Sequence, residues 1–203
     1  MNKTTMTTSN TGYLEIILGP MYSSKSTRLV EIYKQCKFCN IPVTIINHTI
    51  DKRYHDTMLS THDKIMVPCI QANKLSEIWL NNGIDNPAVD NDSYTLLQNS
   101  DVILINEGQF FSDLYEVVID MLNKNKKVYI CGLDGDFERK KFGSILDLIP
   151  LCDKVTKLTS LCSLCKDGTP GIFSMRLTNE REQTVVGSDN YIPVCRKCYN
   201  NKK

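Results

Sequence analysis

Residues 19–29 have the sequence GPMYSSKSTRL and nearly match a phosphate-binding loop, in which a second glycine precedes lysine and serine or threonine. In such a loop the backbone N–H groups hold phosphate oxygens, the lysine reaches the outer phosphates and the hydroxyl ligates Mg²⁺. Lys25 and Ser26 occupy these two positions, but Ser24 stands where the second glycine is expected. A left-handed backbone at Ser24 would cost about 1 kcal/mol, which a folded protein tolerates. The alternative is an ordinary turn between a strand and a helix.

A second group of polar residues follows the apolar run DVILIN, because Asn106 and Glu107 come at the end of a predicted buried strand. Ligands of open α/β sheets bind at the carboxyl ends of the strands, so the Glu107 carboxylate is expected at that edge. An aspartate at such a strand end often holds Mg²⁺, and the neutral amide of Asn106 is a weaker partner for this cation. The alternative for Glu107 is an acid on a solvated loop.

Four cysteines have the spacing of a metal site, since Cys162 and Cys165 form one C-x-x-C pair and Cys195 and Cys198 form another. Two such pairs make a closed tetrahedral zinc site, which is structural. The gap between the pairs is longer than in common zinc ribbons, so a loop or hairpin must bridge it. The alternative is four buried free thiols.

The composition gives no sign of a nucleic-acid partner or a membrane span. Lys and Arg total 24 and Asp and Glu total 23, a net charge of +1 without the basic excess of a nucleic-acid binder. The chain has no long apolar run, and its polar N-terminus lacks the apolar stretch of a secretory signal. Nine cysteines without an export signal favour reduced thiols or metal ligands, and a cytoplasmic location. Outside the two pairs, Cys36 and Cys39 are expected to pack in the core, and three others to be inert: Cys69, Cys131 and Cys152.

Strands that alternate with helices are expected to position these residues. Apolar, β-branched runs predict strands at 13–19, 41–47, 101–106, 127–133 and 153–159. Helical spacing predicts helices at 25–39, 74–80 and 111–124, and polar composition predicts loops at 48–63 and 81–93. This order predicts an α/β fold in which helices flank a parallel sheet. After residue 159, paired cysteines with glycine and proline indicate a small second module.

Taken together and in this order, the motifs resemble those of the cellular-type (class II) thymidine kinases of animals, many bacteria and poxviruses, with a poxvirus-like sequence. The resemblance spans about residues 13–199, and the motifs that carry it are GPMYSSKST at 19–27, DKRY at 51–54, STHD at 60–63, EGQFF at 107–111, LDGDFERKKFGSILDLIPLCDKVTKL from Leu133 and VCRKCY from Val194. It implies phosphoryl transfer from ATP to the 5′-hydroxyl of thymidine, with deoxyuridine as a further acceptor, on the salvage route to dTTP for DNA synthesis. It also implies a homotetramer and feedback inhibition by dTTP.

The resemblance divides the chain into a flexible tail at 1–12, a phosphate-loop kinase domain at 13–159 and a zinc-binding lasso module at 160–203. By motif, Glu107 resembles the catalytic base, and Arg53 would offset charge on the transferred group. The ATP-binding candidates are Gly19, Pro20, Met21, Tyr22, Ser23, Ser24, Lys25, Ser26, Thr27, Asp51, Asn106 and Gln109, among which Ser26 and Asn106 would hold Mg²⁺ directly or through water.

The thymine pocket and its lasso loop are also identified by resemblance. The candidates are Met21, Phe110, Leu133, Phe137 and Phe142 for the apolar walls, and Gln183, Thr184, Val185, Val186, Gly187 and Tyr191 for the loop. The alternatives are ordinary core for the apolar residues and a surface ion pair for Asp51 and Arg53. Arg139 and Lys140 are expected to face solvent, and the alternative for both is a place near the phosphates.

The chain departs from the family pattern at two chemically important positions, because Ser24 replaces a glycine and Asn106 replaces an acid. The basic residue expected near Asn47 is also missing, and the loop at 83–94 is longer. Since Lys25 and Glu107 remain, we predict an active kinase with altered handling of its metal. The alternatives are a weakened or inactive nucleotide-binding relative, a phosphate-loop ATPase with another purpose and a zinc-ribbon nucleic-acid-binding protein.

Overall fold

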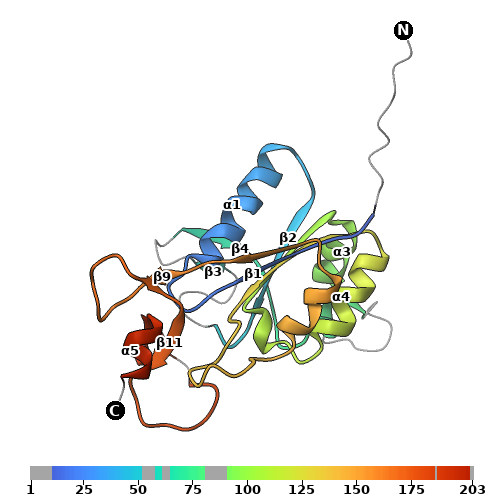
Figure 1. Ribbon diagram of the computed structural model, residues 1–203. Helices are drawn as coiled ribbons and strands as arrows, with labels where there is room; N and C mark the ends of the chain where they lie inside the picture. Colours follow the sequence, from blue (N-terminus) through green and yellow to red (C-terminus); the bar gives the residue numbers. More distant parts are fainter. Residues whose placement is uncertain (1–10, 52–57, 61–64, 81–90, 186, 202–203) are drawn as a thin grey trace.

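The computed structural model describes residues 11–51, 58–60, 65–80, 91–185 and 187–201 (Figure 1). At its centre is a parallel sheet of six strands, in the order β5-β2-β6-β7-β1-β8. These strands are β1 (Tyr13–Leu18), β2 (Val43–His48), β5 (Ile70–Ala72), β6 (Val102–Asn106), β7 (Lys127–Gly132) and β8 (Lys154–Lys157). The predicted α/β fold with a parallel sheet flanked by helices is confirmed.

Helices cover both faces of the sheet, and they form two separate cores with it. On one face α1 (Lys25–Phe38) packs against Val102 and Leu104, and on the other Ile103 and Ile105 pack against helices α2 (Leu75–Trp79), α3 (Asn91–Asn99) and α4 (Leu114–Asn123). Figure 1 shows α1 and α4 on opposite sides of the sheet. Successive side chains of a strand point to opposite faces, so a strand covered on both must be apolar throughout.

The predicted strands match the observed ones to within two residues, but several short elements were not predicted. These are β3 (Met58–Ser60), β4 (Met66–Pro68), β5 and the 3-10 helix η2 (Ile145–Leu151). Three-residue strands give no recognisable alternation. The helix predicted at 111–124 begins only at Leu114, after the 3-10 turn η1 (Gly108–Phe110), and α3 begins at Asn91 inside a segment predicted to be a loop. Within the ranges described above, no helix has the length and apolar character to cross a bilayer.

The last part of the chain forms two small antiparallel pairs and a short helix around a core of its own. Strand β9 (Ser160–Leu161) pairs with β10 (Pro170–Gly171), and β11 (Phe173–Arg176) pairs with β12 (Tyr191–Val194), which α5 (Arg196–Asn200) follows. The core contains Met175 and Val194 beside two cysteines. Figure 1 shows β9, β11 and α5 together, away from α3 and α4. The domain boundaries at residues 12 and 159 stay a prediction.

Helix α2 has only five residues and depends on a carboxylate from the start of α4. The two oxygens of Asp113 accept hydrogen bonds from the backbone N–H groups of Leu75 (3.1 Å) and Ser76 (2.8 Å). Burial by itself would raise the pKa of Asp113, but hydrogen bonds from the side chain and backbone of Ser76 and from Leu75 outweigh it and hold the pKa below its usual range. The carboxylate therefore joins α2 to α4.

We expect Asp113→Asn to lower the free energy of unfolding at pH 7 by about 1–3 kcal/mol, because hydrogen bonds to a charged acceptor are lost. Because the pKa of Asp113 is lower in the folded protein than in the unfolded chain, its carboxylate contributes fully to the free energy of unfolding above the unfolded pKa of about 4. The contribution is lost as the pH falls through the pKa of the folded state. Urea unfolding between pH 2 and 7 should show a shallower acid loss in the variant than in the parent. The exposed Glu116→Gln, on the same helix, is the control, and equal acid slopes in parent and Asp113→Asn would contradict the cap.

Candidate active site

The phosphate-type loop joins β1 to α1 at the carboxyl edge of the sheet. A Cβ atom at Gly19 would lie 2.6 Å from the carbonyl oxygen of Leu158, so only glycine fits there. Tyr22 (φ 62°) and Ser24 (φ 63°) both have left-handed backbones. The Ser24 side chain is exposed and makes no capping hydrogen bond to α1. The loop therefore has the turn that usually calls for glycine, with a serine in it.

Lys25 and Ser26 lie at the start of α1 and point in different directions. The Lys25 side chain is buried, and its Nζ donates to the carbonyl oxygen of Pro20 (2.7 Å) and to Ser23 Oγ (3.5 Å), within the curve of the loop. The Ser26 hydroxyl donates to Asn106 Oδ1 (3.0 Å) at the end of β6. The loop thus combines a cation inside its curve with a hydroxyl directed to the neighbouring strand.

Asn106 lies at the centre of a buried, uncharged network. Its Nδ2 donates to Asn47 Oδ1 (2.7 Å), and its Oδ1 accepts from the Ser26 hydroxyl (3.0 Å) and the Cys131 thiol (3.0 Å). Cys131, which lies outside the C-x-x-C pairs, contributes its thiol to this network. The oxygens of Ser26 and Asn106 are hard ligands in mutual contact, and this donor set fits Mg²⁺.

Glu107 follows β6 with a left-handed backbone (φ 54°), a conformation that costs a non-glycine residue about 1–3 kcal/mol. The Gln109 amide holds its carboxylate, because Nε2 donates to Glu107 Oε2 (2.7 Å) while Oε1 accepts from Leu133 N–H (3.0 Å). Gln109 is itself almost fully buried. Gly143 packs against it so closely that a Cβ there would lie 2.1 Å from the Gln109 carbonyl oxygen. Strained backbone of this kind is typical of functional sites.

A cavity of about 390 Å³ opens between the phosphate-type loop, Glu107 and the loop that follows β11. Most of the predicted site residues line it: Met21, Tyr22, Ser23, Ser24, Lys25, Ser26, Thr27, Asp51, Glu107, Phe110, Leu133, Phe137, Phe142, Gln183, Thr184, Val185, Gly187 and Tyr191. Four predicted residues do not line it: Gly19, Pro20, Asn106 and Gln109. Arg53 and Val186 lie outside the described residues. Phe142 is both buried and in the cavity wall, where its ring meets that of Phe110 edge-on at 5.4 Å.

Six further residues line the cavity and were not predicted: Ile50, Ser60, Gly135, Asp136, Ser174 and Asp189. Asp136 is buried, accepts from the Glu138 and Lys140 N–H groups (both 2.9 Å) and from Gln183 Nε2 (2.8 Å). The sequence Asp-Gly-Asp could have indicated these bonds, because an aspartate in a turn often accepts a hydrogen bond from the backbone N–H group two residues further along the chain. Ser174 Oγ accepts from Met21 N–H (2.9 Å) across 153 residues, and nothing in the sequence indicates such a contact.

His48 lies behind the cavity wall, with its ring 5.6 Å from that of Phe110 and 4.8 Å from that of Phe111. Its Nδ1 accepts from the Ile50 N–H group (3.1 Å). Burial lowers the pKa of His48, against opposing contributions from a hydrogen bond with the Asn73 backbone and from nearby acids. Burial therefore favours the uncharged form of the ring.

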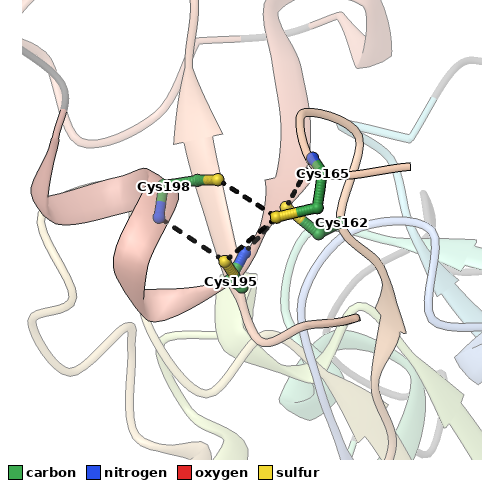
Figure 2. Close-up of side chains that lie close together, drawn as sticks. All are labelled: Cys162, Cys165, Cys195 and Cys198. Carbon is green, nitrogen blue, oxygen red and sulfur yellow. Dashed lines mark hydrogen bonds between the residues drawn. The ribbon is translucent and has the colours of Figure 1, made fainter. Parts of the chain in front are cut away.

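The side chains of the four paired cysteines point toward one another, as Figure 2 shows. Their sulfur atoms all lie within 4.8 Å of one another, with Cys165 Sγ 3.7 Å from Cys195 Sγ and 3.4 Å from Cys198 Sγ. A tetrahedral zinc ion with bonds of about 2.3 Å would separate its sulfurs by about 3.8 Å, so the arrangement fits zinc. The N–H groups of Cys165 and Cys195 donate to Cys162 Sγ (3.5 and 3.3 Å), which suits a thiolate.

The remaining predictions on single residues have mixed outcomes. All nine cysteines are free, and Cys36 packs in the core as expected. Cys39 is exposed instead, because α1 ends at Phe38 and Cys39 has left the buried face. Arg139 and Lys140 are exposed as expected, although the Arg139 guanidinium also lies over the Tyr199 ring at 4.4 Å.

Three features give the class of this α/β protein. They are an open parallel sheet, a phosphate-type loop at the carboxyl edge of that sheet, and a cluster of four cysteines. The family model of thymidine kinase matches residues 12–199, and the chain belongs to that family, which makes it a nucleoside kinase, a transferase. It is 39% identical to the thymidine kinase of Yaba monkey tumor virus (strain VR587) over 94% of this chain and 96% of the relative. It is 39% identical to that of Vaccinia virus (strain Western Reserve), over 94% and 98%, and 35% identical to thymidine kinase 1 of Dictyostelium discoideum, over 94% and 78%.

We expect Ser24→Gly to be more stable than Ser24→Ala by about 1 kcal/mol, because only glycine adopts the left-handed backbone without steric cost. Urea unfolding of the two variants measures this difference. The matched control is the same pair of substitutions at Ser112, where the backbone is not left-handed and glycine should bring no gain. Equal stabilities at position 24 would show that the left-handed turn imposes no strain.

Proposed function

We propose that this protein transfers the γ-phosphoryl group of ATP to the 5′-hydroxyl of thymidine, with deoxyuridine as a further acceptor. One observation carries the proposal: the Glu107 carboxylate lines a single cavity with a phosphate-type loop on one side and aromatic walls on the other. The family and the relatives named thymidine kinase support the choice of nucleoside. The proposal places the triphosphate at the loop and the sugar hydroxyl at Glu107.

The loop would hold the triphosphate through its backbone N–H groups at the start of α1. Lys25 would exchange its hydrogen bond with the Pro20 carbonyl for one with a phosphate oxygen. Bound Mg²⁺, held through Ser26 and Asn106, would supply charge neutralisation between the phosphates. Asp51 also lines the cavity, and Arg53 would offset the charge that builds on the transferred group.

Glu107 would act as the general base. Its carboxylate takes the proton of the 5′-hydroxyl while the new O–P bond forms, and the bond between the γ-phosphorus and the bridging oxygen breaks to release ADP. Gln109 donates a hydrogen bond to one oxygen of the Glu107 carboxylate. This bond would orient the carboxylate to accept the proton of the 5′-hydroxyl. Because the transition state of phosphoryl transfer is loose, placing the hydroxyl in line matters more than strong basicity.

The nucleobase would lie against the aromatic wall, where the Phe110 and Phe142 rings meet edge to face. Flat rings offer a large contact area to a flat base. The backbone groups of Gln183, Thr184 and Val185 would read the edge of the base, with Tyr191 closing the cavity. Zinc bound by the four cysteines would fix the ends of this loop, so that less of it needs ordering when nucleoside binds.

Three further properties belong to the proposal. The protein acts in the cytoplasm, which the nine free cysteines support. It assembles as a homotetramer, and dTTP binds the nucleoside site as a feedback inhibitor. The family resemblance supports both of these properties.

Replacing Glu107 by glutamine should lower turnover of thymidine by a factor of about 10² to 10⁴, because an amide accepts no proton from the hydroxyl. The affinity for ATP should stay within a factor of about two, since the loop is untouched. Steady-state kinetics and equilibrium dialysis with labelled ATP measure the two effects. The exposed Glu31→Gln controls for removing a charge, and full turnover by Glu107→Gln would assign the base elsewhere.

Purified protein should contain one zinc ion per chain by elemental analysis, and Cys195→Ala should contain none. Loss of the metal should destabilise the hairpins after residue 159 and raise KM for thymidine more than KM for ATP. The exposed Cys39→Ala is the matched control, because it removes a thiol outside the cluster. Stoichiometric zinc in Cys195→Ala would remove this cysteine from the ligand set.

A further inference from the structure

Arg176 is the last residue of β11, and its side chain is buried to 1% exposure. Nη1 donates to the carbonyl oxygens of Glu180 (3.0 Å) and Glu182 (2.5 Å), and Nη2 donates to that of Gln183 (3.0 Å). Nε and Nη2 also donate to the Tyr191 hydroxyl (3.2 and 2.5 Å). One guanidinium thus binds three carbonyls of the loop after β11 and the first residue of β12.

Several residues that Arg176 contacts line the cavity, although Arg176 itself does not line it. Gln183 and Tyr191 are cavity residues, and so is Phe137, over whose ring the guanidinium lies at 3.7 Å. The Tyr191 hydroxyl in turn contacts the backbone N–H (3.4 Å) and carbonyl (3.3 Å) of Val185, another cavity residue. Arg176 therefore contacts several residues of the cavity wall without lining the cavity itself.

The same assembly is joined to the four-cysteine cluster. Strands β11 and β12 pair so that Arg176 lies opposite Tyr191. The Phe137 carbonyl accepts a hydrogen bond from the Tyr199 hydroxyl (2.6 Å), and Tyr199 directly follows Cys198. Phe137 is therefore held both by the Arg176 cation over its ring and by a hydrogen bond from α5, the helix that contains Cys198.

We propose that Arg176 is a positioning residue for nucleoside binding, which orders residues 180–185, Tyr191 and Phe137 around the cavity before the nucleoside arrives. This inference rests on the proposed function for the identity of the ligand. Charge-assisted hydrogen bonds hold the loop carbonyls, so the loop loses little further freedom on binding and more of the contact energy appears as affinity. The fork of the guanidinium is required, because a lysine has no planar set of donors with which to reach the same acceptors.

The test compares Arg176→Lys and Arg176→Met with the parent, and uses Arg181→Met as the matched control. Arg181 is exposed on the same loop. We expect both Arg176 variants to raise KM for thymidine at least about tenfold, the order expected when several charge-assisted hydrogen bonds are lost. KM for ATP should stay within about a factor of two, because the phosphate-type loop is intact. Hydrogen exchange of amides 180–185 should be faster in both variants and unchanged in Arg181→Met.

Zinc content and the urea midpoint identify a variant that fails to fold, and Tyr191→Phe then replaces it. This change keeps the ring and removes the hydroxyl, which accepts two bonds from Arg176 and contacts the Val185 backbone, so it should shift KM for thymidine in the same direction. Unchanged exchange at 180–185, or a KM for thymidine that lysine fully restores, would overturn the proposal. A parent protein with no thymidine phosphorylation would refute the proposed function instead, and the exchange measurement would still decide whether Arg176 orders the loop.

Discussion

The parallel register of the four central strands is the constraint on which the site depends. Asn47 of β2 lies opposite Asn106 of β6, and Leu18 of β1 lies opposite Gly132 of β7. Because these strands run the same way and end at the same level, the residues that follow them meet at one edge of the sheet. A register shift between β6 and β7, or between β7 and β1, would separate Glu107 from the phosphate-type loop.

The buried amide pair relates two departures of this chain from its family. Asn106 stands where an acid was expected, the basic residue expected near Asn47 is missing, and the side chains of Asn47 and Asn106 hydrogen-bond to each other. A lone charge at either buried position would lack its partner and would be costly, whereas two amides satisfy each other without charge. The amide at position 106 therefore keeps an uncharged hydrogen-bonded network, and its Oδ1 still accepts from the Ser26 hydroxyl.

The sequence allowed the central strands, α1 and the cysteine cluster to be predicted, because each leaves a local pattern. Apolar runs mark strands covered on both faces, and C-x-x-C spacing marks the cluster. The short strands β3, β4 and β5 leave no such pattern. Arg176 was not predicted, because the sequence alone does not distinguish a buried arginine from an exposed one. Only the folded chain shows which carbonyl groups accept its hydrogen bonds. Ser174 was missed for a similar reason, because its contact with Met21 exists only in the folded chain.

The order of the elements along the chain also sets the order in which the cavity can be built. All six strands of the sheet precede residue 158, whereas the four paired cysteines, Arg176 and Tyr191 follow residue 159. During synthesis, the cavity residues that belong to the sheet and its loops therefore leave the ribosome before those that follow β11. Until the second cysteine pair emerges, the cavity is incomplete and its aromatic side chains are exposed on the nascent chain. Because exposed apolar surface favours misfolding, the nascent chain is most prone to misassembly in the interval before the cysteines bind metal.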